Sequence, residues 1–132
     1  TQILVGLAQE YARQGVFNCL LSNGDWLFTF CSTKLASITR RAPFGPACLK
    51  DVEVEIDFAA ETTPKDVVSV IATEPLTSDE QWDVYERGEW RLWQLGEVVA
   101  SGKVDVPVHS TEAALISPKN MPRDCEPRPG QR

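Results

Sequence analysis

The sequence predicts an α+β fold in which one helix is followed by many strands. Apolar residues recur at helical spacing near the start of the chain, at Leu4, Leu7, Ala8 and Tyr11. After Gly15 the pattern changes to short apolar runs separated by turn residues, which is typical of strands. A helix followed by a series of strands favours an α+β arrangement over repeated βαβ units.

The first segment is predicted to be an amphipathic helix that ends near Gly15. The apolar stripe of Leu4, Leu7, Ala8 and Tyr11 lies on one face of such a helix. Gly15 follows the last residue of the stripe, where glycine commonly caps a helix C-terminus. Because an apolar stripe must be buried, we expect this helix to pack on a sheet.

Asn23-Gly24 predicts a tight β-hairpin, because apolar segments flank this preferred pair for a type I′ turn. A two-residue turn pairs Ser22 with Asp25, so paired residue numbers sum to 22 + 25 = 47. Both faces are then largely apolar, and we expect both to be covered in a layered fold. One face carries Phe17, Cys19, Leu21, Trp26, Phe28 and Phe30, and the other carries Val16, Asn18, Leu20, Leu27, Thr29 and Cys31.

Further strands are predicted from alternation and β-branched runs at residues 35–39, 51–58 and 67–72, with a second hairpin at 90–95 and 97–100 around Gly96. Prolines and a glycine predict a loop over residues 40–46, and the polar segment 77–88 predicts a loop or a short helical turn. Five of the nine prolines follow Gly102, so we expect residues 103–132 to form a loose tail.

The composition excludes several classes of protein. A net charge of −6 does not suit binding to a phosphate backbone, so no nucleic acid partner is expected. Apolar runs are too short to span a membrane, and the start of the chain lacks a signal pattern, so a cytoplasmic location is expected.

The cysteines and the single histidine predict neither a metal site nor a disulfide framework. Cys19, Cys31, Cys48 and Cys125 lack the spacing of zinc ligands, and His109 lies far from a cysteine pair. We expect four free thiols, with Cys125 the most reactive and Cys19 the least, because Cys19 shares a face with buried aromatic rings. No cofactor is predicted.

Several residues have both a functional and a structural interpretation. Asn23-Gly24 could supply an oxyanion hole, but flanking strands favour a turn. Thr1 could be an N-terminal nucleophile, but it precedes a helical stripe, which favours a truncated chain start. Arg40 and Arg41 could bind an acidic ligand or a partner domain, although a solvated turn is favoured.

The remaining candidates are interpreted mainly as structural. Arg91 has the same alternatives as the arginine pair, and His109 is expected to be exposed. Trp26 is assigned to the core, whereas Trp82, in a polar loop, could lie near a site opening or a subunit contact. An acidic strand face could suggest metal binding, but a strand spreads its side chains too far apart and solvation is favoured. That face consists of Asp51, Glu53, Glu55 and Asp57.

Three separated blocks, in order, resemble the C-terminal half of the predicted stand-alone class II glutamine amidotransferases. They are residues 15–28, GVFNCLLSNGDWLF; residues 31–45, CSTKLASITRRAPFG; and residues 62–90, TTPKDVVSVIATEPLTSDEQWDVYERGEW. The resemblance covers roughly residues 1–100. It implies that residues 1–102 are the C-terminal half of a glutamine amidotransferase type 2 domain. That domain has the four-layer αββα sandwich of the N-terminal-nucleophile hydrolases.

The resemblance also implies where the chemistry lies. In this family a cysteine at the mature N-terminus attacks glutamine and its own α-amino group serves as general base. The oxyanion hole and the substrate-binding arginine and aspartate belong to the same N-terminal half, which would precede Thr1. No residue of this chain is therefore assigned a catalytic, substrate-binding or metal-binding role.

The function implied is hydrolysis of the glutamine side-chain amide to glutamate and ammonia by the intact protein. This chain would serve as scaffold and be inactive alone, with glutamine and the missing N-terminal half of the fold as its partners. The alternative is a non-catalytic β-rich scaffold or interaction module. An upstream reading frame encoding Met-Cys at its start would favour the enzyme.

Overall fold

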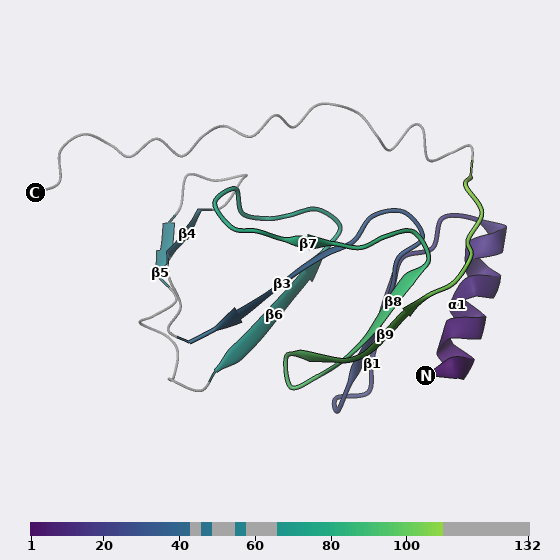
Figure 1. The fold of residues 1–132 in the computed structure, drawn as a ribbon, viewed down its shortest axis with the longest axis horizontal. Coiled ribbons are helices and arrows are strands. Elements are labelled where there is room, and N and C mark those ends of the chain that lie inside the picture. The colour runs from purple at the N-terminus through teal and green to yellow at the C-terminus, as the bar shows by residue number, and fades with distance from the viewer. Residues whose placement is uncertain (43–45, 49–54, 58–65, 110–132) are drawn as a thin grey trace, which may run out of the picture.

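The computed structural model describes residues 1–42, 46–48, 55–57 and 66–109, which form a mixed α and β structure with antiparallel sheets. The first sheet has the strand order β1-β2-β8-β9, the second has the order β6-β3-β7, and β4 pairs with β5. Figure 1 shows the arrangement. The elements are α1 (Gln2–Gln14), β1 (Cys19–Ser22), β2 (Leu27–Phe30), β3 (Ala36–Arg41), β4 (Pro46–Cys48), β5 (Glu55–Asp57), β6 (Val67–Ala72), β7 (Asp83–Val84), β8 (Glu89–Gln94) and β9 (Glu97–Lys103).

The first sheet lies between α1 and the second sheet, and both of its faces are covered (Figure 1). On the helix side, Ala8 and Ala12 pack with Phe28 and Phe30 in one buried cluster. On the opposite side, Cys31, Leu35, Tyr85 and Trp93 form a second cluster, joined by Leu27 from β2 and Ile71 from β6. The layered arrangement predicted from the two apolar faces of the hairpin is therefore confirmed.

The predicted β1–β2 hairpin is present, but its register differs from the prediction. Cys19 pairs with Phe30, so paired numbers sum to 19 + 30 = 49 rather than 47. Asn23 does not occupy the centre of the turn, because its Oδ1 accepts hydrogen bonds from the amides of Asp25 and Trp26 at 3.0 and 3.1 Å. Gly24 takes the first central position, with φ of 97°.

The change in register leaves the predicted faces intact. Successive side chains alternate between the two faces of a strand, so a shift by two residues returns each side chain to the same face. Phe17, Cys19 and Trp26 pack in the cluster beneath the helix, as predicted. Leu27 packs in the cluster between the sheets.

The buried face of α1 differs in part from the predicted stripe. Ala8 and Ala12 are buried, and Leu4 and Val5 pack against the same cluster. Small alanines at this contact let the helix approach the sheet, whereas Leu7 and Tyr11 remain 51% and 56% exposed. The prediction was therefore right for Leu4 and Ala8 and wrong for Leu7 and Tyr11.

The second sheet begins with β3, which continues through two residues that were predicted to lie in a turn. Arg40 and Arg41 pair with Val68 and Val67 of β6. Their ion pairs explain why these arginines belong to a strand, since Arg40 binds Glu80 and Arg41 binds Glu97. Pro46 belongs to β4, so the predicted loop is shorter than expected, and residues 43–45 lie outside the described residues.

The other predicted strands have mixed outcomes. The strands at 35–39 and 67–72 correspond to β3 and β6, and the second hairpin corresponds to β8 and β9. The 77–88 segment contains a short strand, β7. Of the predicted 51–58 strand, residues 55–57 form β5, and residues 51–54 and 58 lie outside the described residues.

Ordered structure continues past residue 102, where the loose tail was expected to begin. Val106 is buried in the cluster beneath the helix. The Nε2 atom of Gln9 donates to the carbonyl oxygen of Asp105 at 2.9 Å, and Nε2 of His109 lies 2.7 Å from the carbonyl oxygen of Ala12. Residues 103–109 thus connect the end of β9 to α1, and His109 is partly buried instead of exposed.

Gly88 joins three segments of the backbone. Its amide donates to the carbonyl oxygen of Cys31 at 2.7 Å, and its own carbonyl accepts the amide of Val104 at 3.0 Å. A Cβ atom at this position would lie 1.8 Å from the carbonyl oxygen of Val104. Together with a φ of 78°, this close approach requires glycine.

We predict that Gly88→Ala destabilises the chain far more than Gly24→Ala. Both glycines have positive φ, and the left-handed conformation alone costs about 1 kcal/mol for alanine. A Cβ at Gly24 meets nothing within 4 Å, whereas Gly88 adds a backbone clash expected to cost about 2 kcal/mol or more. Urea denaturation of the two variants measures the difference. Equal midpoints would contradict the steric argument.

Candidate functional site

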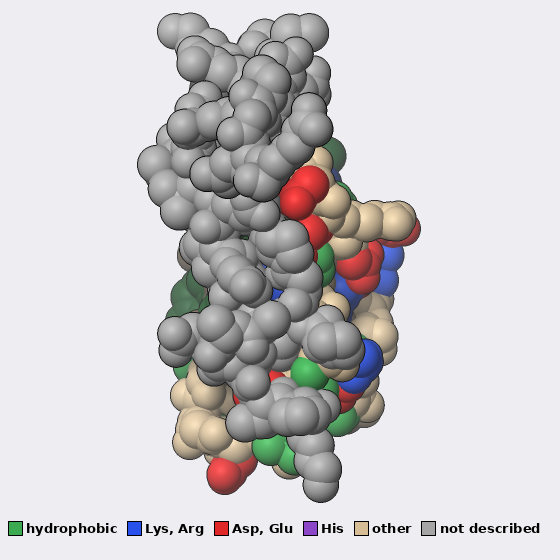
Figure 2. Space-filling model, turned by 90° about the vertical axis from the view of Figure 1, so that its left-hand side faces the viewer, with side chains coloured by type: hydrophobic (Ala, Val, Ile, Leu, Met, Phe, Trp, Pro, Cys, Tyr) green, Lys and Arg blue, Asp and Glu red, His purple; other side chains and the backbone are tan. Residues whose placement is uncertain are grey.

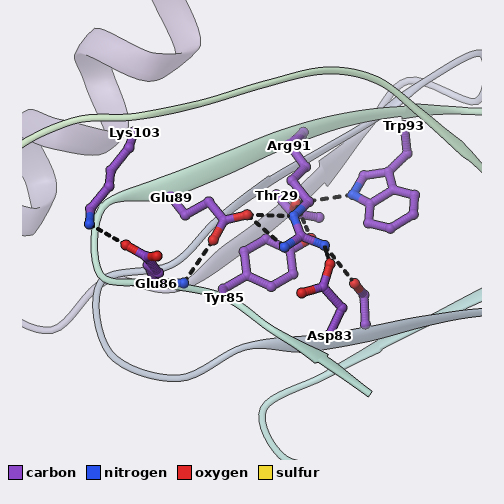
Figure 3. A network of polar contacts seen from close by, with 9 residues as sticks. Thr29, Asp83, Tyr85, Glu86, Glu89, Arg91, Trp93 and Lys103 are labelled. Carbon is purple, nitrogen blue, oxygen red and sulfur yellow. Dashed lines mark hydrogen bonds and ion pairs between the residues drawn. The ribbon is translucent and has the colours of Figure 1, made fainter. Parts of the chain in front are cut away.

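The most concentrated polar group in the described residues surrounds Arg91, on β8 between the two sheets (Figure 3). Its side chain is only 8% exposed. Nε donates to Oε1 of Glu89 at 2.7 Å, and Nη1 donates to Oδ2 of Asp83 at 2.6 Å and to Oγ of Ser37 at 3.0 Å. The guanidinium therefore contacts β3 and β7 of the second sheet from its position on the first.

Aromatic rings and a hydroxyl complete the surroundings of Arg91. The guanidinium carbon lies 4.0 Å from the centre of the Tyr85 ring, a cation–π geometry. The Tyr85 hydroxyl lies 2.9 Å from Oγ1 of Thr29, which also accepts the indole N–H of Trp93 at 3.2 Å. Burial raises the pKa of Tyr85, so its hydroxyl stays protonated at neutral pH.

The network is built to hold the sheets together. The charge of Arg91 is balanced by Glu89 and Asp83, and every buried side-chain N or O atom in the described residues has a hydrogen-bond partner. Glu89 is itself held, because its Oε2 accepts the amide of Glu86 at 2.7 Å. A general base needs an available lone pair and a nucleophile beside it, and these groups are committed to each other.

This role of Arg91 was not predicted from the sequence, in which a solvated position was favoured. The available signal was the alternation in β8. Glu89, Arg91 and Trp93 share one face of that strand, and the large tryptophan on the same face indicates burial. A charged residue between them then requires partners in the core.

Two sequence candidates for catalysis have structural roles instead. Thr1 immediately precedes α1, and its carbonyl oxygen accepts the amide of Val5 at 3.0 Å. Asn23 and Gly24 form the exposed hairpin turn described above. The structure brings neither of them next to the Arg91 network.

Arg40 and Trp82 also differ from their predicted settings. Arg40 is partly buried, and its Nε donates to Oε1 of Glu80 at 2.7 Å. Glu80 accepts a hydrogen bond from Thr77, whose hydroxyl in turn accepts the indole N–H of Trp82 at 2.8 Å. Trp82 is therefore a buried residue that anchors the 77–82 loop.

The described cysteines are free and poorly suited to nucleophilic attack. Cys31 is fully buried, and burial raises the pKa of its thiol to about 11. Burial also raises the pKa of Cys19, which is only partly enclosed. Both thiols are protonated at neutral pH, when a reactive cysteine would be a thiolate. Cys48 and Cys125 lie outside the side chains that the structure describes.

The part of the chain that the structure describes shows no group of three or more metal-ligating side chains. Asp51 and Glu53 of the predicted acidic face fall outside it, and Glu55 and Asp57 lie in β5. Figure 2, viewed from the β4–β5 end, shows described acidic, basic and apolar side chains side by side, without a patch of one charge sign among them.

A hollow of about 360 Å³ opens between the tip of the β1–β2 hairpin, the β8–β9 turn and β6. Leu27, Ile71 and Trp93 form apolar parts of its wall, and Ser22 and Asp25 line it at the hairpin end. The serine hydroxyls that line it donate to backbone carbonyls, Ser22 to Trp26 and Ser69 to Gly96, so neither is paired with a base. No helix in the described ranges has the length and hydropathy required to cross a bilayer.

Comparison with known proteins assigns the chain to a family. The family model described as glutamine amidotransferases class-II matches residues 1–117. The chain belongs to the class-II glutamine amidotransferases. This match extends beyond residue 100, where the resemblance seen in the sequence ended.

Individual relatives carry the same name. YafJ of Escherichia coli (strain K12), provisionally named a glutamine amidotransferase, is 57% identical over 96 residues, which cover 73% of this chain and 38% of YafJ. A Haemophilus influenzae protein with the same provisional name is 40% identical over 99 residues, covering 75% of this chain and 32% of that protein.

A solved structure agrees. The 2.0 Å crystal structure of a predicted glutamine amidotransferase from Pseudomonas aeruginosa PA01 matches with a TM-score of 0.66 and 64% identity, over 75% of this chain and 39% of that one. The amidotransferase chain thus spans roughly a third to two fifths of the length of these relatives.

We predict that Arg91→Met destabilises this amidotransferase chain by about 2 kcal/mol, because it leaves the partly buried Glu89 carboxylate and the buried Ser37 hydroxyl without the guanidinium that bonds them. Arg41→Met is the matched control, since it removes an exposed ion pair with Glu97 and should leave stability nearly unchanged. Chemical denaturation of both variants gives the comparison. Equal effects would mean that the Arg91 network does not join the sheets.

We predict that Cys19 is alkylated before Cys31 in the native chain. From the sequence alone, Cys19 was expected to be the least reactive thiol. Cys31 is fully buried, and burial raises the pKa of its thiol to about 11. Cys19 is only partly enclosed, although burial raises the pKa of its thiol too. Timed iodoacetamide labelling followed by mass spectrometry measures the order. Denatured protein, in which both thiols should react alike, is the control.

Proposed function

We propose that the intact protein hydrolyses the side-chain amide of glutamine to glutamate and ammonia, and that this chain is scaffold for that reaction. The observation that carries the proposal is the class-II amidotransferase family match over residues 1–117. The relatives are about two and a half to three times as long as the stretch that they share with this chain, which leaves room for a catalytic half outside these residues.

The proposed reaction uses a cysteine at the mature N-terminus of the intact protein. Its thiolate attacks the glutamine carboxamide carbon, and the nitrogen takes up a proton and leaves as ammonia. Water then cleaves the thioester, which releases glutamate and regenerates the thiol. The α-amino group of the same cysteine serves as the general base.

The described residues support a scaffold role because none of them fits the nucleophile. Thr1 immediately precedes α1, and burial raises the pKa of the thiols of Cys19 and Cys31. The Arg91 network, the other concentration of charged groups, is internally compensated. We therefore place the nucleophile and its base outside the described residues.

The proposed complete fold is the four-layer αββα sandwich of N-terminal-nucleophile hydrolases. The three layers of helix, sheet and sheet in this chain fit three of those four (Figure 1). In this proposal residues 1–102 are the C-terminal half of the domain. We further propose a cytoplasmic protein, since the described cysteines are free thiols.

A non-catalytic interaction module is the second candidate. Two observations on the described residues favour it. They form two buried apolar clusters, and each of their buried side-chain N and O atoms has a hydrogen-bond partner. A module of this kind would lack glutaminase activity in every context.

We predict that the isolated 132-residue chain releases no glutamate from glutamine above background, because it lacks the nucleophile. The protein completed with an upstream half should turn over glutamine, and replacing its terminal cysteine by alanine should abolish turnover. Coupled glutamate detection measures all three. Activity of the isolated chain that is lost in Thr1→Ala would contradict the scaffold role, and an inactive completed protein would favour the interaction module.

A further inference from the structure

Strand β1 is an apolar edge of the first sheet. The amide of Asn23 donates to the carbonyl of Trp26. Because hydrogen-bonded and non-hydrogen-bonded pairs alternate in an antiparallel ladder, the next pairs bonded to β2 are those of Leu21 and Cys19. The backbone groups of Leu20 and Ser22 therefore point away from β2. Leu20 and Leu21 lie on opposite faces and remain 50% and 48% exposed. An exposed apolar edge of this kind can accept another strand.

The helix layer is open on the same side. Ile3, Leu7 and Tyr11 form a stripe at i, i+4 and i+8 on one flank of α1, and they are 79%, 51% and 56% exposed. This flank lies beside β1, because the ring of Tyr11 is 5.3 Å from the ring of Phe17, which leads into that strand. The stripe and the β1 edge therefore form one continuous apolar side.

The space between the sheets opens there too. Strand β6 is the edge of the second sheet, and the hollow of about 360 Å³ lies between β6 and the β1–β2 hairpin. Its apolar wall of Leu27, Ile71 and Trp93 continues the cluster between the sheets. All three layers are thus incomplete on the side of β1 and β6, which we call the open side.

The opposite side carries the devices that close a sheet edge. The pairing of β9 with β8 shifts register between Leu92 and Trp93 of β8, and β9 begins and ends with the ion-paired Glu97 and Lys103. Irregular pairing and charges at an edge disfavour addition of another strand. The other flank of α1 is covered by residues 103–109, through the bond from Gln9 to Asp105. Val98 and Val99 of β9 are also exposed, at 42% and 54%, so the two edges differ in the irregular pairing and ion pairs of β9 and not in apolar exposure alone.

We propose that the open side is the joint to the remainder of the amidotransferase domain, which adds a strand to β1 and packs a helix beside the Ile3–Leu7–Tyr11 stripe. This rests on the proposed function. The occupant is inferred from length, because about 60% of the chain of these relatives lies outside the matched region. One occupant with helix and strand elements fits three incomplete layers better than three separate partners. An apolar side chain from it would fill the hollow.

The first experiment measures association of the isolated chain by sedimentation. With its joint uncovered, the chain should self-associate, and Leu21→Asp should shift the average mass toward the 14.7 kDa monomer. Val99→Asp is the matched control, a half-exposed residue on β9 at the opposite edge, and it should leave the association unchanged. A monomeric parent chain, or equal effects of the two variants, would overturn the proposal.

The second experiment needs no variant and uses intact YafJ of Escherichia coli at a concentration where it is monomeric. Amide hydrogen exchange at the positions equivalent to Leu20 and Ser22 should be as slow as at the position equivalent to Leu21, because an added strand bonds them. Fast exchange at those two positions alone would show that the edge stays open. Slow exchange that appears only on dimerisation would make a second copy the occupant and overturn the proposal.

Neither experiment measures glutamine turnover, so this inference and the proposed function fail separately. Slow exchange at β1 in a protein that does not hydrolyse glutamine would support the proposed joint and contradict the proposed function. Glutamine turnover by a protein with fast exchange at β1 would support the function and contradict the joint.

Discussion

The guanidinium of Arg91 is the contact on which the arrangement of the two sheets depends. It extends from β8 to Ser37 on β3 and Asp83 on β7, so one side chain spans both sheets. A buried cation has a large desolvation cost, which is offset only when carboxylates and hydrogen bonds surround it. Glu89, Asp83 and the Tyr85 ring meet that requirement. The chemistry of the guanidinium thus fixes which strands face one another.

Local patterns predicted much of this fold because they depend on neighbours in the sequence. The helix, both hairpins and the two apolar faces of the first sheet follow from periodicity and turn residues. The predicted register was wrong because the Asn23 side chain bonds the turn backbone from a flanking position. The faces were still right, since the shift was even. A one-residue error would have exchanged them.

The interpretations that failed are those that depend on distant partners. Arg91 was assigned to solvent, yet its partners come from β3 and β7. Leu7 and Tyr11 belonged to the predicted stripe, yet the contact with the sheet selects the smaller Ala8 and Ala12. No local pattern says which of two apolar flanks of a helix will be covered, because that depends on what packs there. The assignment of no catalytic residue to this chain came from the family resemblance, not from the pattern of residues.

The link between residues 103–109 and α1 has a consequence for the order of folding. Gln9 bonds to a residue 96 positions later, and Ala12 to one 97 positions later. The central pairing of β2 with β8 also joins distant parts of the chain. Contacts of such sequence separation make folding slow, because the entropy of closing long loops is lost before the contacts form. During synthesis the first helix and hairpin must therefore wait, with their apolar faces uncovered, until β8 and β9 have left the ribosome.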